Sequence, residues 1–195
     1  FAKYQMYRNV YWHHACRSAT AMYKRIVEHA VERGTLATGG LGSFTDEGLL
    51  HAVEASGASG GGDPMLAALR ERRLFKRAFE TSAAALPEVS QVDLEWIAED
   101  RERTRSAEAR IARRLKLDPA DVLLDYPAKT QMLGLDVLVA QRDGTVRRLT
   151  QAGLPGAIDL PRLAGELYAS ARCLRVFTAS RVDATAAVRD ELLRA

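Results

Sequence analysis

The residues best suited to chemistry lie near the start of the chain, where four side chains recur at helical spacing: Lys3, Tyr7, Tyr11 and His14. Spacings of three and four residues place side chains on the same face of a helix. A cation, two phenols and an imidazole suit the recognition of a phosphorylated ligand that carries a ring. Spacing alone leaves a second interpretation open, in which the helix is amphipathic and its aromatic side chains pack on a neighbouring element.

A second concentration of cations is the segment RERRLFKR at 70–77, where five basic side chains surround a Leu-Phe pair. In an extended chain, Arg72, Leu74 and Lys76 share one face. Guanidinium and ammonium groups are the usual partners of phosphates, so this face is a candidate anion site. The alternative is a solvated helix end, where cations interact favourably with the helix dipole.

The histidines and cysteines indicate no metal site within the sequence. The histidines are His13, His14, His29 and His51, and none is followed or preceded by an aspartate. Adjacent helical side chains point about 100° apart, so His13 and His14 are interpreted as core or pocket imidazoles. Cys16 and Cys173 have no CxxC or other ligand spacing, so neither a zinc site nor a disulfide framework is predicted.

The elements that must position these residues are mainly helical up to residue 117. An apolar stripe predicts one helix that ends near Gly34, and its members are Met6, Val10, Ala15, Ala19, Met22, Ile26 and Ala30. A short helix is predicted from Thr45 or Asp46, and another from Asp63-Pro64. The glycine-rich run SGASGGGD between these two is interpreted as a mobile loop, and residues 92–117 form a further predicted helix.

After Asp118 the pattern changes to strands. The short runs VLLDYP, LDVLVAQ, TVRRL and CLRVFTA are rich in β-branched residues, and Arg142-Asp143-Gly144 is a hairpin signal. Helices are predicted for LPRLAGELYASA, which Asp159 caps, and for the closing VDATAAVRDELLRA. We therefore expect an α+β fold, with a helical domain at 1–117 and a small antiparallel α+β domain at 118–195.

Composition limits the classes of function. The chain has 195 residues, of which 47% are hydrophobic and 27% charged, enough for one domain or two small ones. No apolar run is long enough to span a bilayer and no signal peptide is apparent, so a cytoplasmic protein without a membrane partner is expected. A nucleic-acid interface on the arginine-rich stretch 101–116 is a weaker alternative, because glutamates interrupt its positive face.

The order of these motifs resembles HD-domain deoxynucleotide triphosphohydrolases, in the region that follows their metal site. The similarity runs loosely from Phe1 to the C-terminus and rests on YQMYRNVYWHH, FTDEGLL, RERRLFKR, VLLDYP, the Asp-Gly hairpin and the RVF strand before the last helix. It implies a parent phosphohydrolase that cleaves a (deoxy)nucleoside triphosphate at the α-phosphate, giving nucleoside and triphosphate.

The resemblance also implies where the catalytic metal is held. In that family a His, a His-Asp pair and a distant Asp hold a divalent metal, Mg, Mn or Fe, which activates water. The sequence contains no His-Asp dipeptide, so these ligands are expected upstream. The chain is therefore expected to be a C-terminal part that binds no metal itself and is inactive alone.

Site residues follow from the same resemblance. Lys3 matches an arginine that contacts substrate phosphates, Tyr7 a catalytic histidine and Tyr11 a substrate-facing tyrosine, so these three are expected to position substrate. Tyrosine at position 7 removes a group that titrates near neutral pH. Arg72 and Lys76 match phosphate contacts of a regulatory nucleotide site, and His13 matches a histidine near it.

The implied partners are a dNTP or GTP ligand and further copies of the chain in a homo-oligomer. A second hypothesis of a different class is a nucleotide-sensing or oligomerisation module with no catalysis of its own. Thermal melting with nucleotides separates these readings, because a ligand that binds only the folded chain raises the melting temperature.

Overall fold

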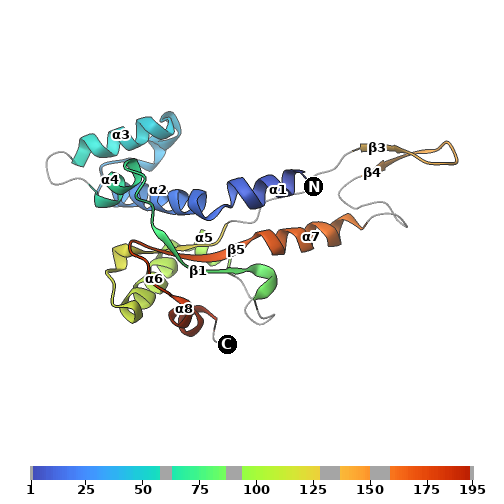
Figure 1. Ribbon diagram of the computed structural model, residues 1–195. Coiled ribbons are helices and arrows are strands. Elements are labelled where there is room, and N and C mark those ends of the chain that lie inside the picture. Colours follow the sequence, from blue (N-terminus) through green and yellow to red (C-terminus); the bar gives the residue numbers. More distant parts are fainter. Residues whose placement is uncertain (1, 58–62, 87–93, 128–136, 150–158, 194–195) are drawn as a thin grey trace.

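The computed structural model describes residues 2–57, 63–86, 94–127, 137–149 and 159–193, apart from the side chain of Lys3. The first part is helical: α1 (Ala2–Met6), the π-helical turn η1 (Tyr7–Tyr11), α2 (His14–Glu32), η2 (Thr38–Ser43), α3 (Asp46–Gly57) and α4 (Pro64–Arg70). Figure 1 shows α1 and α2 following one another along one side of the molecule, with α3 and α4 at the far end of α2.

The single long helix predicted at the N-terminus is wrong, because the chain breaks between η1 and α2. His13 takes an extended backbone (φ −60°, ψ 140°) and caps α2, its Nδ1 accepting from the Ala15 N–H at 3.4 Å. The break changes the buried face: Met6 and Val10 are 44% and 42% exposed, whereas Tyr4 is buried instead. The predicted stripe holds only within α2, where Met22, Ile26 and Ala30 are fully buried.

The starts of α3 and α4 confirm their predicted caps. Asp63 accepts from the Met65 N–H at 2.9 Å and Pro64 occupies the first turn of α4. At α3 the Thr45 hydroxyl accepts from the Gly48 N–H at 3.1 Å. Most of the predicted mobile loop, at 58–62, lies outside the described residues.

The segment after α4 forms strand β1 (Lys76–Ser82), which is followed by η3 (Ala83–Ala85) and was not predicted as a strand. Its apolar alternation is broken by a β-bulge, a shift in register between Arg77 and Phe79. A bulge puts one extra residue into a strand and re-aims the side chains beyond it. Here it lets Arg77 and Glu80, three residues apart, meet in an ion pair at 2.8 Å.

The predicted helix at 92–117 is two helices, α5 (Trp96–Glu99) and α6 (Arg101–Leu115). Asp100 separates them with an extended backbone, and its carboxylate accepts from the Arg103 N–H at 2.9 Å. The continuous helix was therefore wrong at this aspartate, which begins a new helix as its N-cap.

The predicted strands and helices of the C-terminal part are confirmed. They are β2 (Val122–Asp125), β3 (Val137–Ala140), β4 (Val146–Leu149), α7 (Leu160–Ala171), β5 (Cys173–Thr178) and α8 (Thr185–Leu192), and a short helical turn that was not predicted, η5 (Pro119–Asp121), precedes β2. Gly144, with φ +83°, turns the β3–β4 hairpin, and the Asp159 carboxylate caps α7 through the Arg162 N–H at 3.1 Å.

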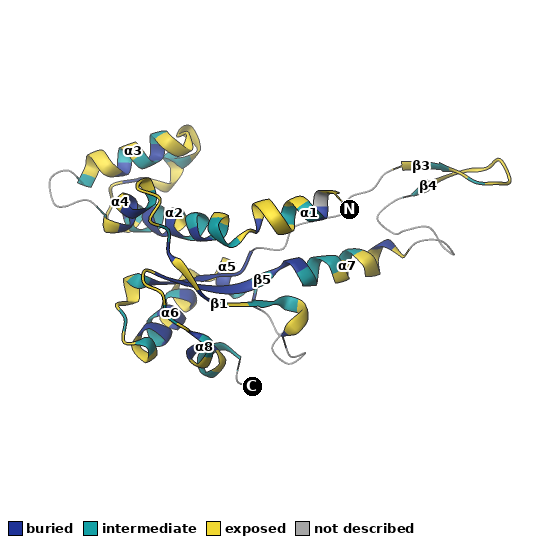
Figure 2. Ribbon diagram, in the orientation of Figure 1, coloured by how far each residue is buried: buried dark blue, intermediate teal, exposed yellow. Residues whose placement is uncertain are grey.

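The main sheet has the strand order β1-β5-β2, with both pairs antiparallel. Alternate residues of β2 and β5 face opposite layers. Leu123 and Phe177 pack with α2 and α4, whereas Val122, Leu124, Leu174 and Val176 pack with α6 and α8. Figure 2 shows the central strand β5 in dark blue along most of its length, as a buried strand.

These observations confirm the α+β fold class and bear on the predicted boundary at residue 117. Strand β1, from the part before it, pairs with β5, from the part after it. Residues on both sides of position 117 therefore contribute to the same sheet and, like Ala78 and Val188, to the same core cluster. Among the described residues, no helix is both long and apolar enough to cross a membrane.

Candidate functional site

A pocket of about 750 Å³ lies where the end of α2, the start of α4 and the segment leading into β1 meet. We call it the basic pocket, because its cationic lining residues are Arg33, Arg72, Arg73 and Lys76, with His29 beside them. Its acidic lining residues are Asp63 and Asp121. The pocket thus contains the two residues, Arg72 and Lys76, that the sequence indicated as phosphate contacts.

Asp63 organises one wall of the basic pocket. It caps α4, and its Oδ2 lies 3.2 Å from His29 Nδ1 and 3.3 Å from an Arg33 Nη2. The Asp63 side chain is 6% exposed, so these contacts compensate the burial of a carboxylate. Asp63 is thus paired with His29 and Arg33, and not with Arg72 or Lys76.

Arg72 lies in the turn that ends α4 and has a left-handed backbone, φ +57°. The turn is closed by two hydrogen bonds, from the Arg72 N–H to Leu69 O at 3.1 Å and from the Arg73 N–H to Ala68 O at 2.8 Å. Glycine is the residue usually found at such a helix end, since a side chain there strains the backbone. The fold therefore holds Arg72 at this position at some conformational cost.

The Leu-Phe pair of RERRLFKR fixes the segment to the core. Phe75 is buried, its carbonyl accepts from the Ser18 hydroxyl at 2.8 Å, and its N–H lies 3.4 Å from Met22 Sδ. This anchor fits the extended interpretation rather than a solvated helix end, because α4 has already ended at Arg70. Lys76 follows directly as the first residue of β1, so its backbone position is fixed as well.

The charges of the basic pocket are unevenly paired. Arg33 pairs with Asp63, and Arg73 pairs with Glu71 at 2.5 Å. Within the described part of the chain, Arg72 and Lys76 are exposed and have no ion-pair partner. Two cations therefore remain for an anionic ligand, and a guanidinium with an ammonium suits an extended chain of phosphates.

The predicted substrate-positioning residues lie elsewhere. The rings of Tyr7 and Tyr11 are 5.4 Å apart, as their spacing predicted, and Tyr7 also contacts Trp12 at 5.3 Å. Tyr7 packs on an aromatic cluster that includes Tyr168 of α7, whereas Tyr11 is 57% exposed. The packing interpretation thus accounts for Tyr7, and the side chain of Lys3 lies outside the described part.

His13 is not in the basic pocket. It is exposed, its ring lies 4.2 Å from that of His14, and both line a separate pocket against β1 and β5. Of the three residues predicted for a regulatory nucleotide site, Arg72 and Lys76 therefore line the basic pocket and His13 lines another pocket.

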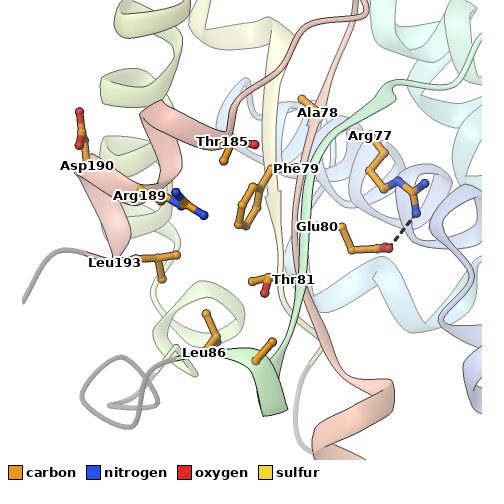
Figure 3. Close-up of a pocket in the computed structure, with 11 residues that line it drawn as sticks. Arg77, Ala78, Phe79, Glu80, Thr81, Leu86, Thr185, Arg189, Asp190 and Leu193 are labelled. Atoms are coloured by element: carbon orange, nitrogen blue, oxygen red, sulfur yellow. Dashed lines mark hydrogen bonds and ion pairs between the residues drawn. The ribbon is translucent and has the colours of Figure 1, made fainter.

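A further hollow, of about 1020 Å³, lies between β1 and α8 (Figure 3). Figure 3 shows Phe79, Leu86 and Leu193 around it, whereas Arg77 and Glu80 point to the other side of β1. Its acidic residue Asp190 pairs with Arg114 at 2.9 Å. Its charged lining residues are Arg77, Glu80, Arg189 and Asp190, two of each sign, so the hollow has no excess of cations comparable to that of the basic pocket.

Four of the six arginines of α6 form ion pairs within the described part of the chain. Arg105 pairs with Glu28 and Glu32 of α2, at 3.3 and 2.9 Å. Arg110 and Arg114 both pair with Glu191 of α8. These ion pairs compete with nucleic-acid phosphates for the same cations, which weakens the alternative of a groove-binding helix.

Sequence reasoning missed His29, Arg33 and Asp121 as members of the basic pocket. They are distant from RERRLFKR along the chain, and only the packing of α2 and the turn before β2 brings them to it. Asp63 was predicted only as a cap. No short-range signal links these positions.

The described residues do not fit a metal ion of the HD type. Nowhere in this part of the chain do three or more His, Cys, Asp or Glu side chains cluster as metal ligands would. We therefore assign no step of metal chemistry to these residues, and what this arrangement can do is bind and orient an anion.

Comparison with known proteins gives two matches. The family model described as the HD associated region matches residues 1–154. The fold is similar to that of a phosphohydrolase from Bacteroides thetaiotaomicron, with a TM-score of 0.51 and 13% sequence identity. The match covers 92% of this chain and 48% of that one, so this chain spans about half the length of the solved protein. No curated protein matches the sequence.

Proposed function

Since this chain belongs to the family of HD-associated regions, we propose that it is the C-terminal part of a metal-dependent HD-domain phosphohydrolase. Its substrate class is (deoxy)nucleoside triphosphates, and the role of this chain is to bind the polyphosphate in the basic pocket. The family match supports the HD context, and the similarity to the Bacteroides phosphohydrolase supports the fold.

The observation that carries the proposal is the pair of unneutralised cations, Arg72 and Lys76, in one pocket of about 750 Å³. A pocket of this size lies within the range that small ligands occupy. Arg72 offers a planar fork of donors to one phosphate, and Lys76 offers a compact charge to the next. Leu74 and Phe75 between them supply apolar surface for the rest of the ligand.

The divalent metal, Mg, Mn or Fe, belongs in this proposal to residues of the intact protein outside this sequence. When bound, such a metal supplies an activated water for attack on phosphorus. This chain contributes binding and orientation, which alone do not hydrolyse a phosphate ester. Tyr7 and Tyr11 are not among the described lining residues of the basic pocket, and together with Lys3 they are proposed to position substrate if that pocket instead holds a regulatory nucleotide.

The test is thermal melting of the protein with GTP and with each dNTP. A ligand that binds the folded state at ~100 times its Kd stabilises it by about 2.7 kcal/mol, which raises the melting temperature by several degrees. The stabilisation should disappear in the double variant Arg72→Ala with Lys76→Ala. The matched control is Arg113→Ala with Lys24→Ala, which removes two exposed cations away from the basic pocket.

Two outcomes contradict the proposal. Nucleotides could stabilise the double variant as well as the wild type, which would place their site elsewhere. A whole protein that contains this chain and is replete with metal could also leave every nucleotide intact, which would exclude the hydrolase.

The second candidate is a nucleotide sensor or assembly module without catalysis of its own. It is favoured by one observation, that the basic pocket has cations but no cluster of metal ligands among the described residues. The two readings differ in the whole protein: Arg72→Ala with Lys76→Ala removes activation by GTP but not basal hydrolysis if the pocket is regulatory. If the pocket binds substrate, both are lost.

A further inference from the structure

A second polar pocket, of about 390 Å³, lies where the break between η1 and α2 meets β1 and β5. We call it the Arg175 pocket. It shares no lining residue with the basic pocket, and its charged lining residues are Arg8, His13, His14, Arg77, Glu80 and Arg175. The proposed function makes no use of it.

Arg175 is the buried arginine among the residues that line this pocket. It lies in the central strand β5, directly opposite Glu80 of β1, and is 4% exposed. Its Nε donates to Glu80 Oε2 at 2.6 Å. Its Nη1 is buried and has no hydrogen-bond partner among the described residues. A buried donor without an acceptor is costly and rare in folded proteins, so this atom calls for an acceptor that occupies the pocket.

The carboxylates near Arg175 do not supply that acceptor. Glu80 already accepts from Arg77 at 2.8 Å and from Arg175 at 2.6 Å. Asp125 also lies opposite Arg175, on β2, but it is held by the guanidinium of Arg17 on α2, with Arg17 Nε donating at 2.9 Å. Glu80 is therefore shared between two arginines, and Asp125 is engaged by a third.

The charge balance of the Arg175 pocket is positive. Arg8, Arg77 and Arg175 line it, and Glu80 is the one carboxylate among its lining residues. Arg8 donates to the hydroxyl of Tyr4 at 3.2 Å, a contact that leaves its charge uncompensated. Three cations against one anion leave two positive charges directed at one small space.

Two other buried arginine nitrogens in the described part of the chain lack a hydrogen bond, but carboxylates balance the charge of their side chains. Arg25 Nε and Arg105 Nε are also unpartnered among the described residues. However, Arg25 pairs with Glu28 and Glu108, and Arg105 pairs with Glu28 and Glu32, so carboxylates balance them. The described lining of the pocket beside Arg25 and Arg105 has four cations and three carboxylates, a smaller excess of positive charge than the three arginines against one glutamate around Arg175.

We propose that the Arg175 pocket binds a phosphate group, with the buried Arg175 as its fixed contact and Arg8 and Arg77 closing over it from the rim. A tetrahedral oxyanion accepts from several guanidinium donors at once, which satisfies the unused Nη1 and neutralises the excess charge. The phosphate is either free inorganic phosphate or the phosphate of a nucleotide.

The pKa of His14 can be used to detect phosphate in the Arg175 pocket, although His14 is not one of the proposed phosphate contacts. Burial, and then the charges of His13, Arg77 and Arg175, lower the pKa of His14, while Glu80 opposes them. Arg8 and Cys173 are the remaining charged or titratable groups of the pocket. A bound phosphate adds negative charge beside the imidazole, which raises the pKa of His14.

The experiment titrates inorganic phosphate into the purified protein and follows the imidazole Cε1–H resonance of His14 by NMR. The expected result is a saturable shift of that resonance, with the His14 pKa higher at saturation. Arg8→Gln should weaken phosphate binding at least tenfold, and so should Arg175→Gln if that variant folds. Arg8 is exposed, so its variant tests the site even if the loss of buried Arg175 prevents folding.

The control is the variant Arg72→Ala with Lys76→Ala, which should bind phosphate at His14 as the wild type does. That result separates this site from the basic pocket, because the proposed function can fail while this one holds. A nucleotide that competes with phosphate at His14 identifies its own phosphate as the ligand, and no competition identifies free phosphate. The inference is overturned if phosphate leaves His14 unshifted, or if Arg8→Gln binds phosphate with unchanged affinity.

Discussion

Arg72 has two properties that oppose each other. Its backbone is left-handed, with φ +57°, which a residue with a Cβ adopts only at a cost. Its side chain is one of the two cations of the basic pocket without an ion-pair partner in the described part of the chain. Stability therefore favours glycine at this position, whereas anion binding favours arginine.

We expect Arg72→Gly to make the protein more stable and the binding of triphosphate weaker. Glycine adopts the left-handed region freely, so the free energy of unfolding should rise by about 1 kcal/mol. Losing the guanidinium should weaken GTP binding about tenfold, the loss of one charged hydrogen bond. Urea denaturation and calorimetric titration with GTP measure the two effects.

Lys116 offers the matched control. It also has φ +57°, at the end of α6, and it does not line the basic pocket. Lys116→Gly should raise the unfolding free energy similarly and leave GTP binding unchanged. A loss of stability in Arg72→Gly, or unaltered GTP affinity, would contradict this account of Arg72.

Single residues were predictable from sequence where their roles are local. The caps Asp63 and Asp159 and the turn residue Gly144 each act on backbone within three residues, and the structure confirms them. Tyr4 and Trp12 were not predicted as buried, because their burial depends on contacts with α7, far along the chain. The presence of Arg72 and Arg33 in the same pocket could not be predicted for the same reason, because the two residues are distant in sequence.

At the level of elements, α6 is joined to α2 and β2 through one buried carboxylate. Glu108 is 2% exposed, accepts from Arg25 Nη2 at 2.5 Å and accepts from the Leu124 N–H at 2.8 Å. Burial nevertheless raises the pKa of Glu108 above its ordinary value of 4.5, outweighing the opposite effects of Arg25 and the Leu124 N–H. The folded chain thus holds a proton on Glu108 more tightly than the unfolded chain.

This predicts a pH dependence of stability that Glu108→Gln removes. The contribution of Glu108 is fully present below pH 4.5 and is lost as the pH rises through the folded pKa. Each pH unit between the two pKa values is worth about 1.4 kcal/mol. Relative to wild type, Glu108→Gln should therefore become more stable as the pH is raised from about 4 to about 8, measured by urea denaturation.

The control for this prediction is Glu102→Gln, an exposed glutamate on the same helix. Its stability relative to wild type should change little with pH, because the Glu102 side chain is exposed to water in the folded chain as it is in the unfolded chain. If the Glu108→Gln difference runs in the opposite direction, the ion pair with Arg25 and not burial determines the charge of Glu108.

Elements were predictable from sequence where one pattern persisted. The strands β2 to β5 and the helix α7 have uninterrupted patterns and lie where expected. Strand β1 was missed because the bulge between Arg77 and Phe79 breaks its alternation. The breaks at His13 and Asp100 were missed because neither glycine nor proline marks them, and each is made by a side chain that caps the next helix.

At the scale of the whole molecule, both pockets are built from segments that are distant in sequence. The basic pocket joins α2, α4 and the chain on either side of the sheet, and the Arg175 pocket joins η1, β1 and β5. Figure 1 shows why: β1 lies beside β5 and under α2, so both pockets form around the same strand. Sequence patterns predicted most of the elements, whereas the residues that meet in each pocket follow from the strand order, which the sequence did not predict.

If the chain forms a homo-oligomer, we expect the β3–β4 hairpin to provide the contact surface between the copies. Leu138 pairs with Arg148 and Ala140 with Val146, so Leu138 and Val146 share a face. They are 65% and 62% exposed. An isolated two-stranded hairpin is marginally stable, and exposed apolar patches commonly mark contact surfaces, so a second copy that covers this face would stabilise it.

We expect Leu138→Asn with Val146→Thr to convert an oligomer into single chains, measured as molar mass by light scattering after size exclusion. Threonine and asparagine keep approximately the same volumes but remove the hydrophobic driving force of association. The control Leu163→Asn changes an apolar residue of α7 that is 43% exposed and should leave the molar mass unchanged. An unchanged mass in the hairpin variant, at a concentration where the wild type is oligomeric, would show that the chains associate through another surface.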